Sequence, residues 1–221
     1  MKLSVISRVF GETVLYRDFS LELREGSVTA ILGPSGCGKT TLLNEIASRA
    51  TDPPLSFVFH EPRHIPWRTL GENIALVLSG DTNARKNMAL KYLERVGLGD
   101  RADDYPENLS GGERQRVSIA RAFAVPSAVL LMDEPFQSQD ATTKAQLIAL
   151  FMELQKDEKR TIVAVTHDTR EAKAIAERAI LLTGRPVRIA LDTTVSNNLE
   201  SEITTAMGNE IALHDIIQSD E

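Results

Sequence analysis

Residues 27–40 read SVTAILGPSGCGKT, an apolar run directly followed by a glycine-rich turn. The first six residues have the composition of a short strand buried in a parallel sheet. Residues 33–40 match the pattern G-x-x-x-x-G-K-[ST], and a helix is predicted from Lys39 to Arg49. A strand, a glycine loop and a helix in this order predict a phosphate-binding loop in an α/β protein.

The residue types in this loop suit a nucleotide. Gly33, Gly36 and Gly38 permit a backbone whose N–H groups point inward, and the helix start adds partial positive charge. We expect Lys39 to reach the β- and γ-phosphates and the Thr40 hydroxyl to bind Mg²⁺. The other predicted nucleotide contacts are Pro34, Ser35, Cys37 and Thr41. Cys37 is interpreted as a filler whose alkylation would impair nucleotide binding.

A second nucleotide element is predicted at residues 128–135, AVLLMDEP. An apolar strand ending in two carboxylates places Asp133 to hold Mg²⁺ through water, and Glu134 to polarise the attacking water as general base. His167 likewise closes the strand TIVAVTH, residues 161–167. Because ligands of open α/β sheets bind at the carboxyl ends of the strands, we expect His167 to contact the γ-phosphate.

The composition is ordinary for a soluble globular protein: the 221 residues are 42% hydrophobic and 25% charged. A net charge of −6 argues against a dominant nucleic-acid surface, so no nucleic-acid partner is expected. The lone Cys37 excludes an internal disulfide and fits a reducing compartment. We find no signal peptide and no apolar run of the roughly 20 residues that span a bilayer. Any work at a membrane is therefore expected to need a partner there.

Strands and helices alternate along the chain. Strands are predicted at residues 3–9, 19–23, 27–32, 55–59, 128–132, 161–166 and 179–182. We therefore predict one α/β domain over residues 1–221, a P-loop NTPase fold with a mainly parallel sheet core. The nucleotide-binding core comprises residues 1–59 and 126–221 and includes an N-terminal antiparallel β part. Residues 60–125 are predicted to form an inserted helical subdomain.

Residues 109–122, LSGGERQRVSIARA, begin another helix. Ser110 and Glu113 have the spacing of a capping box, in which each side chain binds the backbone N–H of the other residue. A capping box does not need Gly111 and Gly112. Two glycines leave the helix N-terminus bare, so a phosphate can approach its N–H groups.

With this segment, the sequence resembles the ATP-binding subunits of ABC transporters over nearly the whole chain. GPSGCGKT is similar to their Walker A loop, LSGGERQR to their signature, LLMDEP to their Walker B motif and His167 to their switch histidine. The resemblance places Asp140 at the D-loop aspartate. Phe10, 29 residues before Lys39, falls at the aromatic residue that stacks on adenine, with Tyr16 as the alternative.

The resemblance implies a head-to-tail homodimer that binds ATP and Mg²⁺ between its protomers. Ser110, Gly111, Gly112 and Glu113 of one protomer would complete the ATP site of the other, as helix-end donors to its phosphates. ATP hydrolysis by this dimer is the expected activity. In the family, the D-loop residues before the aspartate are usually small and apolar. The segment FQSQD, residues 136–140, departs from this pattern, and the departure affects residues that the resemblance places in the dimer contacts.

Residues 57–67, FVFHEPRHIPW, contain the main departure from the family. His60 stands where the Q-loop glutamine contacts Mg²⁺ and the attacking water. Mg²⁺ disfavours imidazole nitrogen, so His60 is open to three roles: metal ligand, water positioning or a brake on hydrolysis. A paired metal site with His64 is disfavoured, because Pro62 and Pro66 oppose the helix that would align the two rings.

Two segments are similar to importers of the nitrate, sulfonate and taurine type: EPRHIPWRTLGENIAL (61–76) and LLTGRPVRIALD (181–192). In these importers the Q-loop region receives a coupling helix of the integral membrane permease. Exposed Ile65, Trp67 and Leu70 are therefore the expected docking residues, although Trp67 has the alternative of packing the subdomain onto the core. The resemblance further implies an extracytoplasmic solute-binding protein and a peripheral location on the cytoplasmic face of the membrane.

Two other functions stay open. One is a soluble ABC ATPase of DNA or ribosome processes. Only 70 residues separate Lys39 from Leu109, which is too few for the long coiled coil of the DNA-type members. The chain also has a single nucleotide-binding domain, whereas the ribosome-type members usually have two. The other is a poorly hydrolysing sensor of nucleotide occupancy, which His60 and residues 136–140 favour. The segment after residue 192 is interpreted as a polar tail, and no separate regulatory domain is expected.

Overall fold

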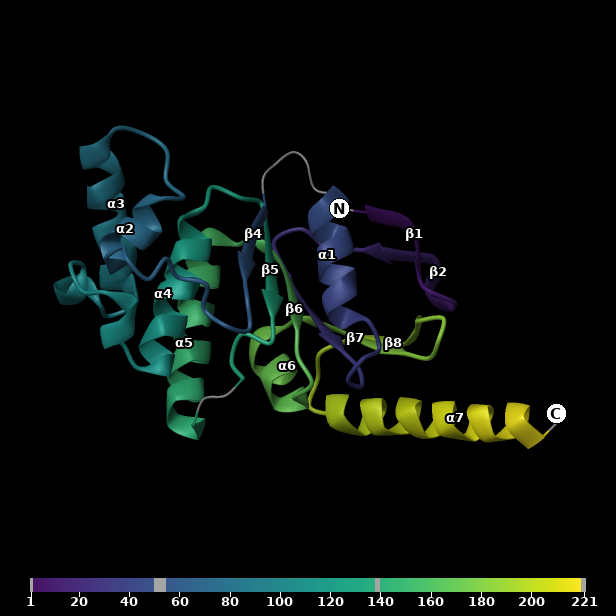
Figure 1. Ribbon diagram of the computed structural model, residues 1–221. Helices are drawn as coiled ribbons and strands as arrows, with labels where there is room; N and C mark the ends of the chain where they lie inside the picture. The colour runs from purple at the N-terminus through teal and green to yellow at the C-terminus, as the bar shows by residue number, and fades with distance from the viewer. Residues whose placement is uncertain (1, 50–54, 138–139, 220–221) are drawn as a thin grey trace. The chain divides into compact units, whose positions relative to one another are not determined.

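The computed structural model describes residues 2–49, 55–137 and 140–219, which form two compact units (Figure 1). The first unit joins Met1–Arg49 to Thr161–Glu221, and the second is Ala50–Arg160. Both combine strands with helices, so the predicted α/β class is confirmed. The predicted helical subdomain, residues 60–125, lies within the second unit, which also holds two strands and a long helix of its own.

Strand β3 (Val28–Leu32) lies at the centre of the main sheet of the first unit. It pairs in parallel with β6 (Thr161–Val165) on one side and with β7 (Arg178–Thr183) on the other. Every residue of β3 and β6 is buried, as expected for strands covered on both faces. Strand β8 (Arg188–Thr194) runs antiparallel to β7, so the importer-like segment 181–192 lies within a β-hairpin.

The first unit also contains a separate antiparallel pair, β1 (Lys2–Phe10) and β2 (Thr13–Glu22). Its helices are α1 (Lys39–Arg49), α6 (Thr169–Ile175) and α7 (Leu199–Ser219). Helix α7, the long yellow helix of Figure 1, forms from the segment that the sequence predicts only as a polar tail. Leu199 and Ile203, one helical turn apart, bury against the sheet and anchor it.

In the second unit, β4 (Leu55–Val58) pairs in parallel with β5 (Val129–Asp133). The helices are α2 (Leu70–Ala75), α3 (Thr82–Arg95), α4 (Gly111–Ala124) and α5 (Ala141–Glu158). Short 3₁₀ turns at Gly99–Arg101 and Pro106–Asn108 lie between α3 and α4. Figure 1 shows α2 beside α3 and α4 beside α5, and both pairs are in contact.

Aromatic rings fill the core of the second unit. The ring of Phe151 on α5 lies 6.2 Å from that of Phe123 on α4 and 5.9 Å from that of Phe136, in edge-to-face geometry. Phe151 belongs to the apolar stripe that helical spacing predicts along α5. In the described ranges, no helix is both long and apolar enough to cross a membrane.

Candidate functional site

The glycine loop, residues 33–38, connects the carboxyl end of β3 to the start of α1. Gly33 has a φ of +151°, and a side-chain Cβ there would lie 2.5 Å from the carbonyl oxygen of Leu182. Gly38 has a φ of +99°, and a Cβ there would lie 3.1 Å from the Tyr16 hydroxyl and 3.2 Å from the methyl groups of Leu15. Only glycine fits both the space and the backbone conformation at these two positions. Pro34, Ser35 and Gly36 of the loop are exposed.

Lys39 begins α1 and folds back over the loop. Its ammonium group donates to the carbonyl oxygens of Gly33 at 2.8 Å and of Pro34 at 2.9 Å, and its side chain is buried. The first turn of α1 holds no acidic residue, so the positive end of the helix dipole is not neutralised by its own side chains. A cation and the N–H groups at the start of a helix therefore lie at one place, which suits a polyphosphate. Thr40 and Thr41 follow directly on α1, with Thr40 exposed.

Tyr16 supports the glycine loop through a hydrogen bond to its backbone, a role that the sequence did not indicate. Its ring is fully buried and packs edge-on against Phe19, and its hydroxyl donates to the carbonyl oxygen of Gly38 at 3.0 Å. Burial raises the pKa of Tyr16, so the hydroxyl keeps its proton. A buried ring cannot stack on adenine, so the alternative given to Tyr16 is wrong. The side chain of Phe10, the first choice for that role, lies outside the described part of the structure.

Cys37 is buried inside the loop, with 5% of its surface exposed. Burial raises the pKa of the thiol, and the charge of Lys39 offsets only part of that effect. A buried, protonated thiol reacts slowly with alkylating agents. The structure therefore supports a packing role for Cys37, and access to the thiol limits the expected sensitivity to alkylation.

His167 lies at the same sheet edge as the glycine loop. It follows β6, the neighbour of β3, and the backbone N–H of Thr166 donates to the carbonyl oxygen of Ile31 at 3.1 Å. Asp168 caps α6 by accepting from the N–H of Arg170 at 2.8 Å. His167 itself is exposed. Within the first unit, the structure thus brings the switch histidine and the phosphate loop to one edge of the sheet.

Asp133 and Glu134 end β5 in the second unit, as predicted. Glu134 has a φ of +47°, an uncommon conformation for a residue with a side chain, and such strain often marks a functional position. The next peptide is fixed by buried Gln115 of α4, whose side-chain amide donates to the carbonyl oxygen of Pro135 at 2.7 Å. This contact joins the Walker B turn to the signature helix. Its sequence signal is a glutamine one turn before Ile119 on the apolar face of the helix.

The predicted capping box of α4 is present. The Ser110 hydroxyl accepts from the N–H of Glu113 at 3.3 Å, and the Glu113 carboxylate accepts from the N–H of Ser110 at 2.8 Å. Arg101 also donates to Glu113 at 2.7 Å. The hydrogen bond from the Ser110 N–H, followed by the contacts with the Ser110 hydroxyl and Arg101, lowers the pKa of Glu113. The Glu113 carboxylate is thus bound to neighbours within its own chain. The helix start left for a ligand is made by Ser110, Gly111 and Gly112.

Asp140, the predicted D-loop aspartate, is the N-cap of α5. Its carboxylate accepts from the N–H groups of Thr142 and Thr143, both at 3.0 Å, and from the Thr143 hydroxyl at 2.6 Å. The bonds from Thr143, followed by the one from Thr142, lower the pKa of Asp140. Residues 138 and 139 of FQSQD lie outside the described residues.

His60 and His64 occupy different environments on an irregular segment after β4, where no helix forms. His60 is exposed. His64 has both ring nitrogens buried, and neither has a hydrogen-bond partner among the described residues. Burial, together with the charges of Arg121 and Arg114, lowers the pKa of His64 to about 4. The two histidines therefore do not share one environment.

The segment that follows presents Trp67 to solvent. Trp67 is 77% exposed, which contradicts the alternative that it packs the subdomain onto the core. The expectation that Leu70 is exposed is wrong: it begins α2 and is fully buried, one turn from buried Ile74. Buried Asn73 holds the segment by accepting from the N–H of Ile65 at 2.8 Å and donating to carbonyl oxygens on either side of Trp67. Ile65 is half-buried.

A surface pocket of about 460 Å³ lies between α2 and α3 in the second unit. Its polar rim combines three cations with two carboxylates: Arg68, Arg85, Lys86, Glu72 and Asp103. The Nε atom of Arg85 is buried and has no hydrogen-bond partner among the described residues.

Comparisons with known proteins agree on one family. Residues 16–137 match the ABC transporter family. An aliphatic sulfonates import ATP-binding protein of Paraburkholderia xenovorans is 42% identical over 194 residues, which cover 84% of this chain and 76% of that protein. A protein of the same description from Albidiferax ferrireducens is 41% identical over 207 residues, covering 86% of this chain and 73% of the relative.

Solved structures show the same fold. The dimeric bacterial ABC transporter cassette MJ0796 superposes with a TM-score of 0.73 at 27% identity, covering 88% of this chain and 97% of that one. Its post-hydrolysis dimer bound to ADP and Pi gives a TM-score of 0.71 at the same identity and coverage. The fold class predicted from the sequence is thereby confirmed.

Proposed function

Because this chain belongs to the ABC transporter family, we propose that it is the ATP-hydrolysing motor subunit of an ABC importer. The observation that carries the proposal is the glycine loop of residues 33–38 closed by the buried ammonium group of Lys39. The names of the relatives support import over the DNA or ribosome alternative. Sulfonates, named for those relatives, are the substrate class we propose for the complete system.

ATP binding begins with an exchange of partners at Lys39. Its ammonium group donates to the carbonyl oxygens of Gly33 and Pro34. A triphosphate offers stronger, charged acceptors to the same group, and the start of α1 contributes N–H donors. Tyr16 keeps the loop in shape through Gly38 while this exchange takes place.

Hydrolysis is assigned to the carboxylate and imidazole groups at the strand ends. Glu134 accepts a proton from the attacking water, whose oxygen bonds to the γ-phosphorus as the bond to the β–γ bridging oxygen breaks. ADP and phosphate are the products, and His167 donates to the γ-phosphate oxygens. The Thr40 hydroxyl and the Asp133 carboxylate offer the oxygen donors that Mg²⁺ prefers, so they fit this ion. When bound, Mg²⁺ neutralises charge on the phosphates.

The ATP site is completed by a second copy of the chain. Ser110, Gly111 and Gly112 offer the bare start of α4 to the nucleotide held by the partner's loop, as in the head-to-tail arrangement of the family. The dimeric cassettes to which this chain is similar support this arrangement. Asp140, at the start of α5, is assigned to the same dimer interface.

Docking to an integral membrane permease is assigned to the surface around Trp67 and the neighbouring pocket. Trp67 is the most exposed large apolar side chain described, and the cationic residues Arg68, Arg85 and Lys86 line the pocket beside it. A permease helix that presents an apolar residue and a carboxylate or a carbonyl end fits both features. We accordingly propose that the motor works at the cytoplasmic face of the membrane, in a system with an extracytoplasmic solute-binding protein.

The proposal is tested by measuring Mg²⁺-ATP hydrolysis against protein concentration. We expect the native rate per chain to rise with concentration, because the site needs two chains. Glu134→Gln is expected to lower kcat by about 10²–10⁴-fold, the usual contribution of a general base, while ATP still binds. A native protein that hydrolyses no ATP at any concentration, alone or with its permease, contradicts the motor and favours the occupancy sensor.

His60→Gln, measured in the same assay, distinguishes the roles left open for this residue. A lowered kcat with unchanged ATP affinity of the monomer places His60 beside the attacking water. A raised kcat identifies a brake that the permease would release. An unchanged rate excludes His60 from the hydrolytic step.

A further inference from the structure

The C-terminal end of the signature helix α4 is closed by a residue from far along the chain. The guanidinium group of Arg160 donates to the carbonyl oxygen of Val125 at 2.8 Å, to that of Ala122 at 3.2 Å and to that of Phe123. Pro126 follows, so the helix cannot continue and supply these carbonyls with partners. A cation at this end also complements the helix dipole.

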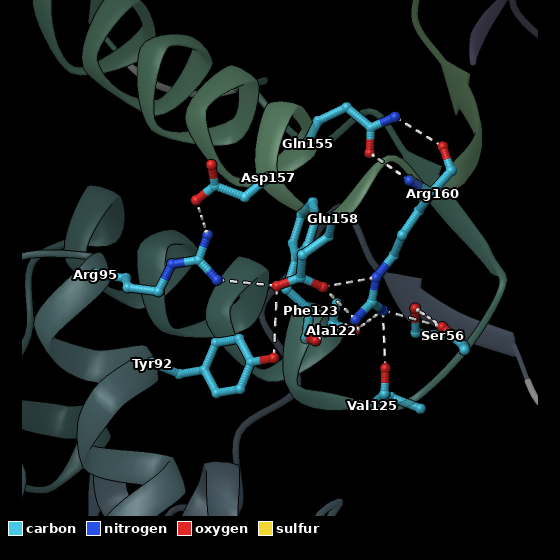
Figure 2. A network of polar contacts seen from close by, with 11 residues as sticks. Ser56, Tyr92, Arg95, Ala122, Phe123, Val125, Gln155, Asp157, Glu158 and Arg160 are labelled. Atoms are coloured by element: carbon cyan, nitrogen blue, oxygen red, sulfur yellow. Dashed lines mark hydrogen bonds and ion pairs between the residues drawn. The ribbon is translucent and has the colours of Figure 1, made fainter. Parts of the chain in front are cut away.

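Arg160 is itself held in place from several sides (Figure 2). Its backbone N–H and carbonyl both bond to the side chain of Gln155, at 3.0 and 2.7 Å. Its Nε donates to the Glu158 carboxylate at 2.9 Å, and its Nη1 to the Ser127 hydroxyl at 3.1 Å. The residue is 8% exposed. A guanidinium group with this many partners is restricted to one conformation. It therefore holds the C-terminal end of α4 in a fixed place.

Glu158 extends the network to a third helix. Its second carboxylate oxygen accepts from Arg95 at 2.9 Å and lies 3.5 Å from the Tyr92 hydroxyl, both in the last turn of α3. Arg95 also donates to Asp157 at 2.8 Å. Figure 2 shows the ends of α3, α4 and α5 converging on this single cluster of charges, all within the second unit.

We propose that Arg160 is a positioning residue for the signature motif: by fixing the C-terminal end of α4, it orients Ser110–Gly112 at the opposite end. This inference rests on the proposed function, in which that end enters the ATP site of the partner. The 14 residues of α4 make a lever roughly 20 Å long, so a tilt of about 3° moves its start by about 1 Å. A misplacement of this size costs catalytic sites about 10²-fold.

The test separates ATP binding by one chain from ATP-driven dimerisation. In the Glu134→Gln background, which holds ATP without turnover, the dimer dissociation constant is measured by sedimentation. The ATP affinity of the monomer is measured with a fluorescent analogue at low protein concentration. We expect Arg160→Gln to raise the dimer constant at least about tenfold and to leave monomer affinity within about twofold, because the phosphate loop belongs to the other unit.

The matched control is Arg178→Gln. Arg178 is similarly buried, bonds to Asp192 at 2.6 and 2.7 Å and donates to the Glu22 carbonyl, but it belongs to the first unit. Both variants are expected to lower Tm. Only Arg160→Gln should weaken dimerisation, and Arg160→Lys should recover part of the loss, because an ammonium keeps the charge but not the planar fork.

If Arg160→Gln does not fold, Glu158→Gln replaces it. This change removes the charge that holds the guanidinium and should weaken dimerisation in the same direction, by a smaller factor. Equal dimerisation by native protein, Arg160 variants and Glu158→Gln, or equal loss in Arg178→Gln, overturns the inference. If the reference protein, with Arg160 unchanged, does not dimerise with ATP, the proposed function is overturned instead.

Discussion

Single buried polar side chains hold the backbone at each functional loop of this protein. The Tyr16 hydroxyl supports the phosphate loop at Gly38, the Gln115 amide fixes the Walker B turn at Pro135, and Asn73 holds the segment around Trp67. Each side chain is buried, so its removal leaves a backbone group without a partner. Residues that touch no ligand therefore shape the surfaces that do.

Tyr16→Phe tests this support at the phosphate loop. Loss of the hydroxyl leaves the Gly38 carbonyl unpaired, and we expect the free energy of unfolding to fall by about 1 kcal/mol. We also expect ATP affinity to fall several-fold, because the loop is held less tightly. Thermal unfolding and binding of a fluorescent nucleotide measure the two effects. Tyr105→Phe, at a side chain that is 43% exposed, should change neither.

His64 predicts a loss of stability in acid. Its pKa is about 4 when folded and 6.5 when unfolded, so only the unfolded chain gains a proton as the pH falls through this range. The stability is complete above pH 6.5 and declines toward pH 4, by about 2 kcal/mol at pH 5. Urea unfolding of native protein and His64→Gln between pH 7.5 and 4.5 measures the difference. Parallel pH profiles for the two proteins would show that His64 is not the group that titrates.

At the scale of elements, α4 is held at both ends by side chains. Ser110 and Glu113 cap its N-terminus, and Arg160 closes its C-terminus. Between these ends, Gln115 and Phe123 bind it to the Walker B turn and to α5. A helix that is fixed at both ends and along its length has little freedom to move by itself. The N-terminal residues of α4 therefore move only together with the second unit.

Ser110→Ala is expected to act on stability and on dimerisation. Loss of the cap costs about 1 kcal/mol. Asp81→Ala removes the corresponding cap of α3, which accepts from Asn83 and Ala84 at 2.9 Å, at a similar cost. Only Ser110→Ala should also weaken ATP-driven dimerisation in the Glu134→Gln background. Sedimentation measures this, and an equal effect of both variants would reduce Ser110 to a helix cap.

At the scale of the whole molecule, the nucleotide machinery is divided between the two units. The phosphate loop and His167 belong to the first, and Asp133, Glu134 and the signature helix belong to the second. The proposed permease surface lies on the second unit, so it shares a body with the signature helix.

Trp67→Ala is expected to uncouple this body from the membrane partner. In vesicles that contain the permease, we expect the variant to bind at least about tenfold more weakly, as for an exposed aromatic hot spot at an interface. Met207→Ala removes another exposed apolar side chain, on α7, and should bind as the native protein does. Equal binding by all three proteins would place the docking surface elsewhere.

Local features of this protein were predictable because short-range chemistry decides them. The glycine loop follows from a strand, three glycines and a lysine within 14 residues, and the capping box of α4 from a serine and a glutamate three positions apart. The α/β class followed from the alternation of apolar strands with helices. The α7 helix was missed because a mostly polar segment owes its anchoring to Leu199 and Ile203 meeting a sheet formed elsewhere.

The sequence by itself determined the family, the motif order and the phosphate loop, and it assigned the expected role of each motif residue. Only the tertiary structure decided that Leu70 is buried while Trp67 is exposed, that Tyr16 supports the loop, and that Arg160 closes α4. Tyr16 reaches Gly38 across 22 residues, and Arg160 reaches Ala122 across 38. Burial and partners at such separations depend on how distant segments pack, and no local pattern records that packing.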